Sequence, residues 1–305
     1  MTLAYVLMYH RVCERTEDTA CWFARGTAVT PEHFATQIGW LRSRVRFVPL
    51  DAAVEGVLSG GGSDQRPLCA VTFDDGYRDA QVAVDQGVPA TVFAVAAHTG
   101  DARDALWFDR YYDILHSARR RASVQGALLE LPADAVVPAI DDDLCWWVRG
   151  PVKEALQAME PTARDERLRQ ISEVLDASSR TLPRDLYFSR DELGALMRSG
   201  HAVGGHGASH SRLTSLDDAT LAAELAASRA LVDGLGDQPA RLFCYPDGAW
   251  DGRVQAAVRT AGFPIACAVT EGVVSVESPR LALPRILMRD VLPGERGWPA
   301  ALEAP

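Results

Sequence analysis

The sequence predicts an α/β fold, a (β/α) barrel with a helical insertion, on three observations. Short apolar runs typical of strands alternate with amphipathic helical stretches over most of the 305 residues. Two polar motifs directly follow such runs, and the alternation breaks between residues 101 and 190. Because α/β enzymes carry their chemistry at the carboxyl ends of parallel strands, the two motifs are expected to meet at one end of the barrel.

In the first hundred residues, strand-like and helical patterns follow one another. Thr30 and Pro31 are typical of a helix N-terminus, where a capping side chain precedes a proline at the first helical position. Asp51 is predicted to cap a second helix, which ends before a glycine-rich turn. The predicted elements are strands at 3–9, 46–50, 68–73 and 90–95, and helices that begin at 31, 51 and 79.

The alternation resumes near residue 190. Ser189 and Glu192 form a capping box that opens a helix ending at Gly200. The tail after Leu292 is rich in Pro and Gly and is predicted to be loosely ordered. The other predicted elements are strands at 201–205, 241–245, 264–269 and 281–286, and helices at 217–235 and 251–261.

The predicted organisation is a barrel built from residues 1–100 and 191–292, a helical insertion at 101–190 and a tail at 293–305. Within the insertion, helical periodicity covers 107–121 and 152–175. Its aromatic residues are expected either to line a lid over a binding site or to bury the insertion against the barrel.

Composition and charge exclude some classes of protein. A net charge of −10, from 31 Lys and Arg against 41 Asp and Glu, argues against nucleic-acid binding. The apolar N-terminus is too short to span a bilayer and lacks a basic leader and a cleavage pattern, so a buried strand and no membrane span are expected. Six cysteines without Cys-x-x-Cys spacing are expected to be reduced, which favours a cytoplasmic location over a clipped exported protein.

Two motifs carry the chemistry. Asp74 and Asp75 end an apolar run at Gly76, and His206 and His210 stand four positions apart in a glycine-rich turn. One carboxylate and two imidazoles can hold a borderline metal and leave a position open for water. The other carboxylate is then free to take a proton from that water. The joint pattern predicts a metal-dependent hydrolase, although each motif alone is also typical of an ordinary turn or a surface pair.

The stretch Thr-Phe-Asp-Asp-Gly around Asp74 and the stretch Gly-His-Gly-Ala-Ser-His-Ser-Arg-Leu around His206 resemble the first two motifs of a known family, the NodB-homology polysaccharide deacetylases of carbohydrate esterase family 4. The resemblance implies a distorted, incomplete (β/α) barrel and one divalent metal, expected to be Zn²⁺. It implies that Asp74 is the base and that Asp75, His206 and His210 hold the metal. Zinc in such a site lowers the pKa of its bound water and polarises the amide carbonyl of the substrate.

The segment Arg-Leu-Phe-Cys-Tyr-Pro-Asp-Gly that ends at Gly248 resembles the third motif of the family. By this resemblance, Asp247 supplies a backbone N–H to the oxyanion, at a position where the family usually has Tyr. The Arg that braces the base in the family falls on Cys244, so the brace is missing or comes from elsewhere. Arg285 and Arg11 are two alternatives for it, and either could instead form a plain surface ion pair.

A general acid is also needed for the leaving amine. The family carries it in a C-terminal Leu-x-x-His segment, which is absent here, whereas Leu-Met-Tyr-His ends at His10 after the first predicted strand. This resembles the permuted arrangement of the poly-N-acetylglucosamine deacetylases and implies that His10 is the acid; a structural histidine at a strand end is the alternative. The permuted arrangement also implies that strand 3–9 lies beside strand 281–286.

The leading hypothesis is metal-dependent removal of an N-acyl group, acetyl above all, from an amino sugar or polysaccharide. Tyr245, Trp107 and His98 are expected to contact this substrate. A close rival is deformylation, or hydrolysis of another carbon–nitrogen bond, on a small or lipid-linked substrate. A third hypothesis is a catalytically weak, metal-bearing carbohydrate-binding protein; Asp74 counts against it, because metal binding alone would not need two adjacent carboxylates.

Overall fold

The structure, a computed structural model, describes residues 3–59, 66–99, 105–118, 137–175, 177, 182, 185–236 and 241–303. Its strands are β1 (Ala4–Tyr9), β2 (Arg11–Val12), β3 (Ala28–Val29), β4 (Arg46–Phe47), β5 (Leu68–Phe73), β6 (Ala90–Ala94), β7 (Ala202–Gly205), β8 (Leu242–Cys244), β9 (Ile265–Glu271) and β10 (Leu283–Leu287). Its α-helices are α1 (Ala20–Arg25), α2 (Pro31–Arg42), α3 (Leu50–Leu58), α4 (Gln81–Asp85), α5 (Trp107–Ala118), α6 (Leu144–Arg149), α7 (Pro151–Ala158), α8 (Pro161–Val174), α9 (Arg190–Arg198), α10 (Asp218–Asp233) and α11 (Gly252–Thr260).

The main sheet is parallel and closes on itself. Its strands follow the order β1-β10-β9-β8-β7-β6-β5-β4, and β1 also pairs with β5 over its whole length. This second pairing makes a ring of all these strands except β4, which pairs with the first residues of β5 beside the ring. The predicted (β/α) barrel is therefore confirmed. Leu7 of β1 lies opposite Ile286 of β10, so the N-terminal strand lies beside the last one, as the permuted arrangement implies.

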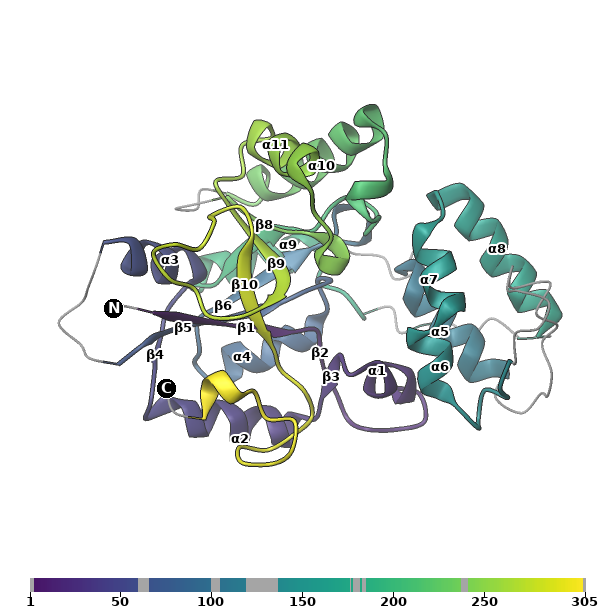
Figure 1. The fold of residues 1–305 in the computed structure, drawn as a ribbon, viewed down its shortest axis with the longest axis horizontal. Helices are drawn as coiled ribbons and strands as arrows, with labels where there is room; N and C mark the ends of the chain where they lie inside the picture. Colours follow the sequence, from purple (N-terminus) through teal and green to yellow (C-terminus); the bar gives the residue numbers. More distant parts are fainter. Residues whose placement is uncertain are drawn as a thin grey trace.

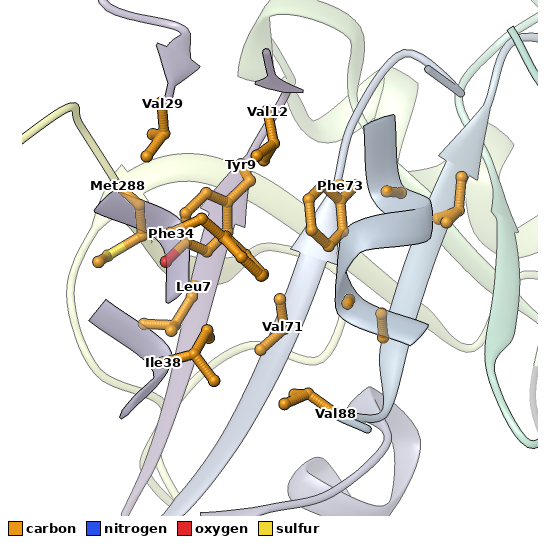
Figure 2. Packing of buried hydrophobic residues seen from close by; sticks show 14 of the residues in the cluster. Leu7, Tyr9, Val12, Val29, Phe34, Ile38, Val71, Phe73, Val88 and Met288 are labelled. Atoms are coloured by element: carbon orange, nitrogen blue, oxygen red, sulfur yellow. The ribbon is translucent and has the colours of Figure 1, made fainter. Parts of the chain in front are cut away.

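Side chains of β1 and β5 alternate between the outside and the inside of the barrel. The odd-numbered residues point outward, where Phe34 and Ile38 of α2 pack against them; Figure 2 shows Leu7, Tyr9, Val71 and Phe73 in this layer. The even-numbered residues of both strands, which include Ala4, Val6, Leu68 and Ala70, point into the interior. There they pack with residues of the other strands, which include Cys244, Cys267 and Leu283. Since His10 and Asp74 continue the even-numbered series, the alternation directs both side chains inward at the carboxyl end of the barrel.

Helices cover the outside of the barrel on opposite sides. In Figure 1, α10 and α11 lie above the strands and α2 lies below them, and both chain termini lie on the side away from α5 to α8. The upper layer buries Leu221 and Leu225 of α10 and Val254 of α11 with Phe243 of β8. The N-cap of α2 is the one that the sequence indicates, since the Thr30 side chain accepts the backbone N–H of His33. At α11 the Asp251 side chain accepts the backbone N–H of Val254.

The helices α5 to α8 form a separate group beside the barrel (Figure 1). They have an apolar core of their own, which includes Trp107, Tyr111, Trp147 and Leu156. Trp22 of α1 belongs to the same cluster, so an N-terminal helix that the sequence pattern did not indicate completes it. We call these four helices the insertion helices.

Three expectations need correction. Asp51 does not cap a helix, because α3 begins one residue earlier at Leu50, with Pro49 at the N-cap position. The helical pattern at 152–175 is two helices, since Pro161 starts α8 at its first turn after α7 has ended. The tail is packed rather than loosely ordered, because Trp298 and Leu302 are buried in the cluster outside β1.

The glycine-rich turn after α3, residues 119–121 of the predicted helix 107–121 and the last two residues of the tail lie outside the described residues. No helix in the described ranges is long and apolar enough to cross a membrane.

Candidate active site

Polar segments directly follow four barrel strands and meet at the carboxyl end of the barrel. His10 follows β1, Asp74 follows β5 and His206 follows β7, and Tyr245 is the first residue after β8. Together with Asp75, His210 and Asp247 they line one cavity with a volume of about 390 Å³. The strand ends thus bring together the residues that the sequence predicts for a metal and for acid–base chemistry.

Asp75, His206 and His210 form a compact group of metal-ligand type. The Oδ1 atom of Asp75 lies 3.4 Å from His206 Nε2 and 3.2 Å from His210 Nε2. Tetrahedral zinc with bonds of about 2.0 Å to nitrogen and oxygen holds its ligand atoms roughly 3.3 Å apart, which matches both distances from the Asp75 oxygen. Ligand atoms of the three residues all lie within 4.8 Å of one another. All three side chains are buried, and Asp75 Oδ1 has no hydrogen-bond partner among the described residues. The donor set and its spacing therefore fit a zinc ion.

The backbone at this group is unusual. Among the described residues, Asp75, His210 and Asp247 are the non-glycine residues with positive φ, at 71°, 57° and 56°. Such conformations are uncommon outside glycine and persist where surrounding structure holds them, often at functional sites. The turn at Asp75 also explains how two adjacent carboxylates face different partners.

A second group could also be read as a metal site, since ligand atoms of Asp74, His206 and Cys244 lie within 4.8 Å of one another. However, both oxygens of Asp74 already bind a guanidinium, and burial raises the pKa of the Cys244 thiol, so the thiolate form is disfavoured. His206 Nδ1 lies 2.8 Å from the carbonyl oxygen of Cys244, to which it can donate while Nε2 faces Asp75. The first group is therefore the better metal site.

Arg285 holds the carboxylate of Asp74. Its Nη1 and Nη2 atoms donate to Oδ1 and Oδ2 of Asp74, each at 2.7 Å, and Arg285 is fully buried. The remaining donors bind the carbonyl oxygen of Ala268, the hydroxyl of Thr72 and the sulfur of Cys244. Burial raises the pKa of Asp74, but the Arg285 charge and its hydrogen bonds outweigh this and hold that pKa below its ordinary value.

Of the two arginines that the sequence suggested as braces, the structure brings only Arg285 to Asp74. Arg11 instead pairs with Asp79, and its guanidinium lies over the rings of Trp22 and Tyr77. The arginine beside Asp74 thus comes from the last barrel strand, β10. Cys244, at the end of β8, is small enough for the guanidinium to lie against its sulfur.

His10 stands next to the same carboxylate. Its Nε2 atom lies 3.9 Å from Asp74 Oδ2, and its Nδ1 atom is buried without a hydrogen-bond partner in the described part of the chain. Burial lowers the pKa of His10 below its ordinary value, against the opposite effect of Asp75 and Asp74. The imidazole is therefore neutral at neutral pH, and it lies beside Asp74 at a distance that one water molecule can bridge.

Asp247 faces the insertion helices. Its Oδ1 atom lies 3.6 Å from the ammonium of Lys153 on α7, and both side chains are buried. Burial lowers the pKa of Lys153 to about 8, although the Asp247 charge opposes this. The sequence does not indicate Lys153, because a helical pattern does not show which of its residues will face the barrel.

The aromatic wall of the cavity differs from the predicted one. Trp107 is buried in the core of the insertion helices and does not line the cavity; its ring lies beneath the guanidinium of Arg164. His98 does not line it either, and its ring lies 6.2 Å from that of Tyr187. Phe108 takes their place, with its ring 5.0 Å from that of His210. Tyr245 lines the cavity as expected, and its hydroxyl donates to the carbonyl oxygen of Leu281.

Glu224 of α10 is a further residue that the sequence analysis missed. Its carboxylate accepts the backbone N–H groups of Ala208 and Ser209, at 2.7 and 3.1 Å, and the Ser209 hydroxyl at 2.6 Å. A Cβ at Gly207 would lie 3.0 Å from it, so glycine permits the close approach. Glu224 thereby holds the turn that carries both histidines. A buried carboxylate on the apolar face of a predicted amphipathic helix was the available signal.

The family model described as polysaccharide deacetylase matches residues 162–266. This range contains the turn with His206 and His210 and the segment at Asp247, whereas Asp74 and Asp75 lie before it. A comparison with curated protein sequences finds no match.

Solved structures of deacetylases share the fold. The deacetylase PplD of Streptococcus pyogenes, in complex with acetate, superposes with a TM-score of 0.59 at 12% identity, over 94% of this chain and 93% of that one. IcaB from Ammonifex degensii superposes with a TM-score of 0.55 at 18% identity, over 94% of this chain and 92% of that one. A de-N-acetylase from Aggregatibacter actinomycetemcomitans superposes with a TM-score of 0.55 at 13% identity, over 94% of this chain and 95% of that one. The likeness extends over nearly the whole chain, and at these identities it is a likeness of fold.

Proposed function

We propose that this chain is a polysaccharide deacetylase of the NodB-homology type and acts as a metal-dependent N-deacylase of acylated amino sugars; its partial family match and its fold support this. The family indicates a hydrolase of carbon–nitrogen bonds other than peptide bonds. One observation carries the metal dependence: Asp75 Oδ1 lies 3.4 and 3.2 Å from two imidazole nitrogens, beside a second carboxylate that is held separately. Metal binding and base catalysis thus fall to different carboxylates.

The metal, when bound, would activate a water molecule and polarise the acyl carbonyl. Asp74 would take the proton of the attacking water at Oδ2, because Arg285 keeps the carboxylate ionised and fixed in orientation. His10 Nε2, 3.9 Å from that oxygen, would receive this proton through one bridging water molecule and deliver it to the leaving nitrogen. The backbone N–H of Asp247 would donate to the carbonyl oxygen as negative charge develops on it.

The experiment that tests this proposal identifies the acid released. Purified protein, loaded with zinc or treated with a chelator, is incubated with N-acetylglucosamine, its oligomers and the matching N-formyl sugars. We expect acetate from the N-acetyl compounds, with the rate abolished by the chelator and restored by zinc. Release of formate with no acetate would favour the deformylase alternative. Stoichiometric zinc binding without release of any acid would support the carbohydrate-binding alternative and contradict the proposed activity.

The reduced state of the cysteines is compatible with the cytoplasmic location expected from the sequence, since all six are free thiols. We retain this location as part of the proposal; fractionation of the producing cells tests it.

A further inference from the structure

The wall of the active-site cavity is rich in arginine. Arg25, Arg149, Arg212 and Arg289 line it, in a chain whose net charge is −10. They come from four separate segments: the last residue of α1, the last residue of α6, the residue that follows the histidine turn, and the loop after β10. One cavity thus receives four guanidinium groups, from α1, from the insertion helices and from two loops of the barrel.

Two of these side chains meet over Gly26. A Cβ built on Gly26 would lie 2.6 Å from Arg289 Nη1 and 2.9 Å from Arg149 Nη2, so these nitrogens are no further apart than the sum of the two distances. Gly26 ends α1 in the left-handed conformation, with φ at 79°, where glycine is favoured, and its missing side chain leaves the space that the guanidinium groups occupy. Arg25 directly precedes Gly26 and lines the same cavity, and its Nη1 donates to the carbonyl oxygen of Val148, the neighbour of Arg149, at 3.4 Å.

Among the residues that the structure describes, few carboxylates face these arginines. Within the ranges that the structure describes, none of the four makes an ion pair at 4.0 Å or less. Two carboxylates of the cavity are already engaged, Asp74 by Arg285 and Asp247 by Lys153, and Asp75 belongs to the metal site. Glu154 of α7 is the one other carboxylate among the described lining residues, against four guanidinium groups.

Arg149 and Arg289 are exposed and Arg25 and Arg212 are half-buried, so the four side chains lie where the cavity meets solvent. Like charges gathered there create a positive field that attracts an anion into the cavity. The field of these arginines reaches the catalytic end, since Arg25 and Arg212 both contribute to lowering the pKa of Lys153 after burial, and both lower the pKa of Asp247 against burial. The Nε atom of Arg212 is moreover buried without a partner in the described part of the chain. The planar guanidinium fork matches phosphate oxygens, and a phosphoryl group offers three acceptor oxygens where a carboxylate offers two.

We propose that the substrate carries a phosphoryl group as well as its acylated amino sugar, and that Arg25, Arg149 and Arg289 bind this phosphoryl group while the acyl group lies at Asp75, His206 and His210. This inference rests on the proposed N-deacylase function and specifies its substrate class. The phosphoryl group can belong to a dissolved sugar phosphate or to a sugar linked to a lipid through phosphate; both present the same chemistry to the three arginines.

The direct test is binding of inorganic phosphate to metal-free protein, followed by calorimetry. Removing the metal is essential, because phosphate would otherwise bind to the metal itself. We expect saturable binding that weakens with salt, and that weakens roughly tenfold or more in the double variant Arg149→Ala/Arg289→Ala, since charge-assisted hydrogen bonds are lost. The matched control is Arg280→Ala: Arg280 pairs with Glu55 near the amino end of β9, at the opposite end of the barrel. Absence of saturable binding, or equal binding in the double variant, would overturn the inference.

A second measurement separates this inference from the function on which it rests. For zinc-loaded protein, the ratio of kcat/KM for N-acetylglucosamine 1-phosphate over N-acetylglucosamine should exceed one, fall at least tenfold in the double variant and stay unchanged in Arg280→Ala. A higher kcat/KM for a prenyl-phosphate-linked sugar in detergent micelles than for the dissolved sugar phosphate would identify a lipid-linked substrate. A lower kcat/KM would identify a soluble one. Deacetylation without phosphate preference would contradict the substrate class and leave the activity standing. Phosphate binding at the arginines without hydrolysis of any acylated sugar would contradict the activity and leave the anion site standing.

Discussion

Asp74 and Asp75 are neighbours in the chain, yet they face different partners. Asp74 binds the guanidinium of Arg285 through both oxygens, whereas Asp75 presents one oxygen to two imidazoles. The left-handed conformation of Asp75 separates the two side chains. A carboxylate fixed by an arginine stays ionised and oriented, which suits a base, and a carboxylate facing two imidazoles suits a metal ligand.

The variant Asp74→Asn should therefore keep its metal and lose roughly 10²- to 10⁴-fold in turnover, the usual scale for a positioned general base. Metal analysis and steady-state kinetics on the same preparation check both statements. Because Arg285 loses its charged partner inside the barrel, the assays belong well below the melting temperature of the variant. Loss of metal from Asp74→Asn together with its retention in Asp75→Asn would show that the two roles are reversed.

The proposed role of His10 as the acid rests on its place after the first strand, since the C-terminal Leu-x-x-His segment is absent from this sequence. If His10 protonates the leaving amine, His10→Ala should leave the metal content intact and lower the rate on N-acetyl sugars. Activated esters need no proton on their leaving group, so the same variant should lose much less of its rate on 4-nitrophenyl acetate. Equal loss on both substrates would indicate that His10 positions other groups and is not the acid.

At the scale of elements, one buried carboxylate joins the insertion helices to the barrel. Asp109 of α5 accepts hydrogen bonds from Trp22 Nε1, from the hydroxyl of Tyr77 and from the hydroxyl of Tyr187. These donors lie on α1, after β5 and before α9, so Asp109 connects four segments. Burial raises its pKa to about 6, against the hydrogen bonds of the two tyrosines.

Asp109→Ala should lower the free energy of unfolding by roughly 3 kcal/mol or more, because several buried donors lose their acceptor at about 1–3 kcal/mol each. Asp109→Asn keeps an acceptor oxygen and the shape of the side chain, and it should cost clearly less. Urea denaturation of the three proteins measures the difference. Equal stability of wild type and Asp109→Ala would mean that the contacts between these segments do not depend on this carboxylate.

Lys153 on α7 gives the insertion helices a dependence on pH. Its pKa in the folded state is about 8, below the ordinary value near 10.5, so the folded protein releases this proton before the unfolded chain does. Between pH 8 and pH 10.5 the unfolded state binds more protons, and stability therefore rises with pH, by up to about 3 kcal/mol in total. The difference in unfolding free energy between wild type and Lys153→Met should shift in favour of wild type by this amount from pH 7 to pH 10.5. A difference that stays constant with pH would contradict the buried position of the ammonium.

Much of the element order is predictable from the sequence, because it rests on local signals. The apolar runs before Asp74 and His206, the capping box at Ser189 and the proline after Thr30 all mark elements that the structure contains. The grouping of Asp75 with both histidines follows from the same signals, since parallel strands bring their carboxyl ends together.

Other features depend on contacts between distant segments and have no local signal. The tail illustrates this: its Pro and Gly content is typical of loose chain, yet Trp298 packs edge-on against Trp40 of α2 and is buried. Trp107 illustrates it within the site, since an aromatic residue at the start of a helix can face either a cavity or a core. Lys153 stands in no motif, and it reaches the site only because its helix packs beside that part of the barrel.

At the scale of the whole molecule, closure of the barrel determines which residues share the site. β1 lies between β5 and β10, so a histidine near the N-terminus, a carboxylate from β5 and an arginine from the last strand come together. The chain order of these groups differs from their order in space. The first and last strands can therefore supply His10 and Arg285 to the same site, because they are neighbours in the closed barrel.

The central claim is that Asp75, His206 and His210 bind one divalent metal on which hydrolysis depends. Metal content of the purified protein, determined by mass spectrometry, tests it most directly, in wild type, in His206→Ala and in the control His116→Ala, whose ring lies outside the cavity beside Asp18. We predict about one equivalent of zinc in wild type and in the control, and loss of that equivalent in His206→Ala. Full retention of the metal in His206→Ala would contradict the claim.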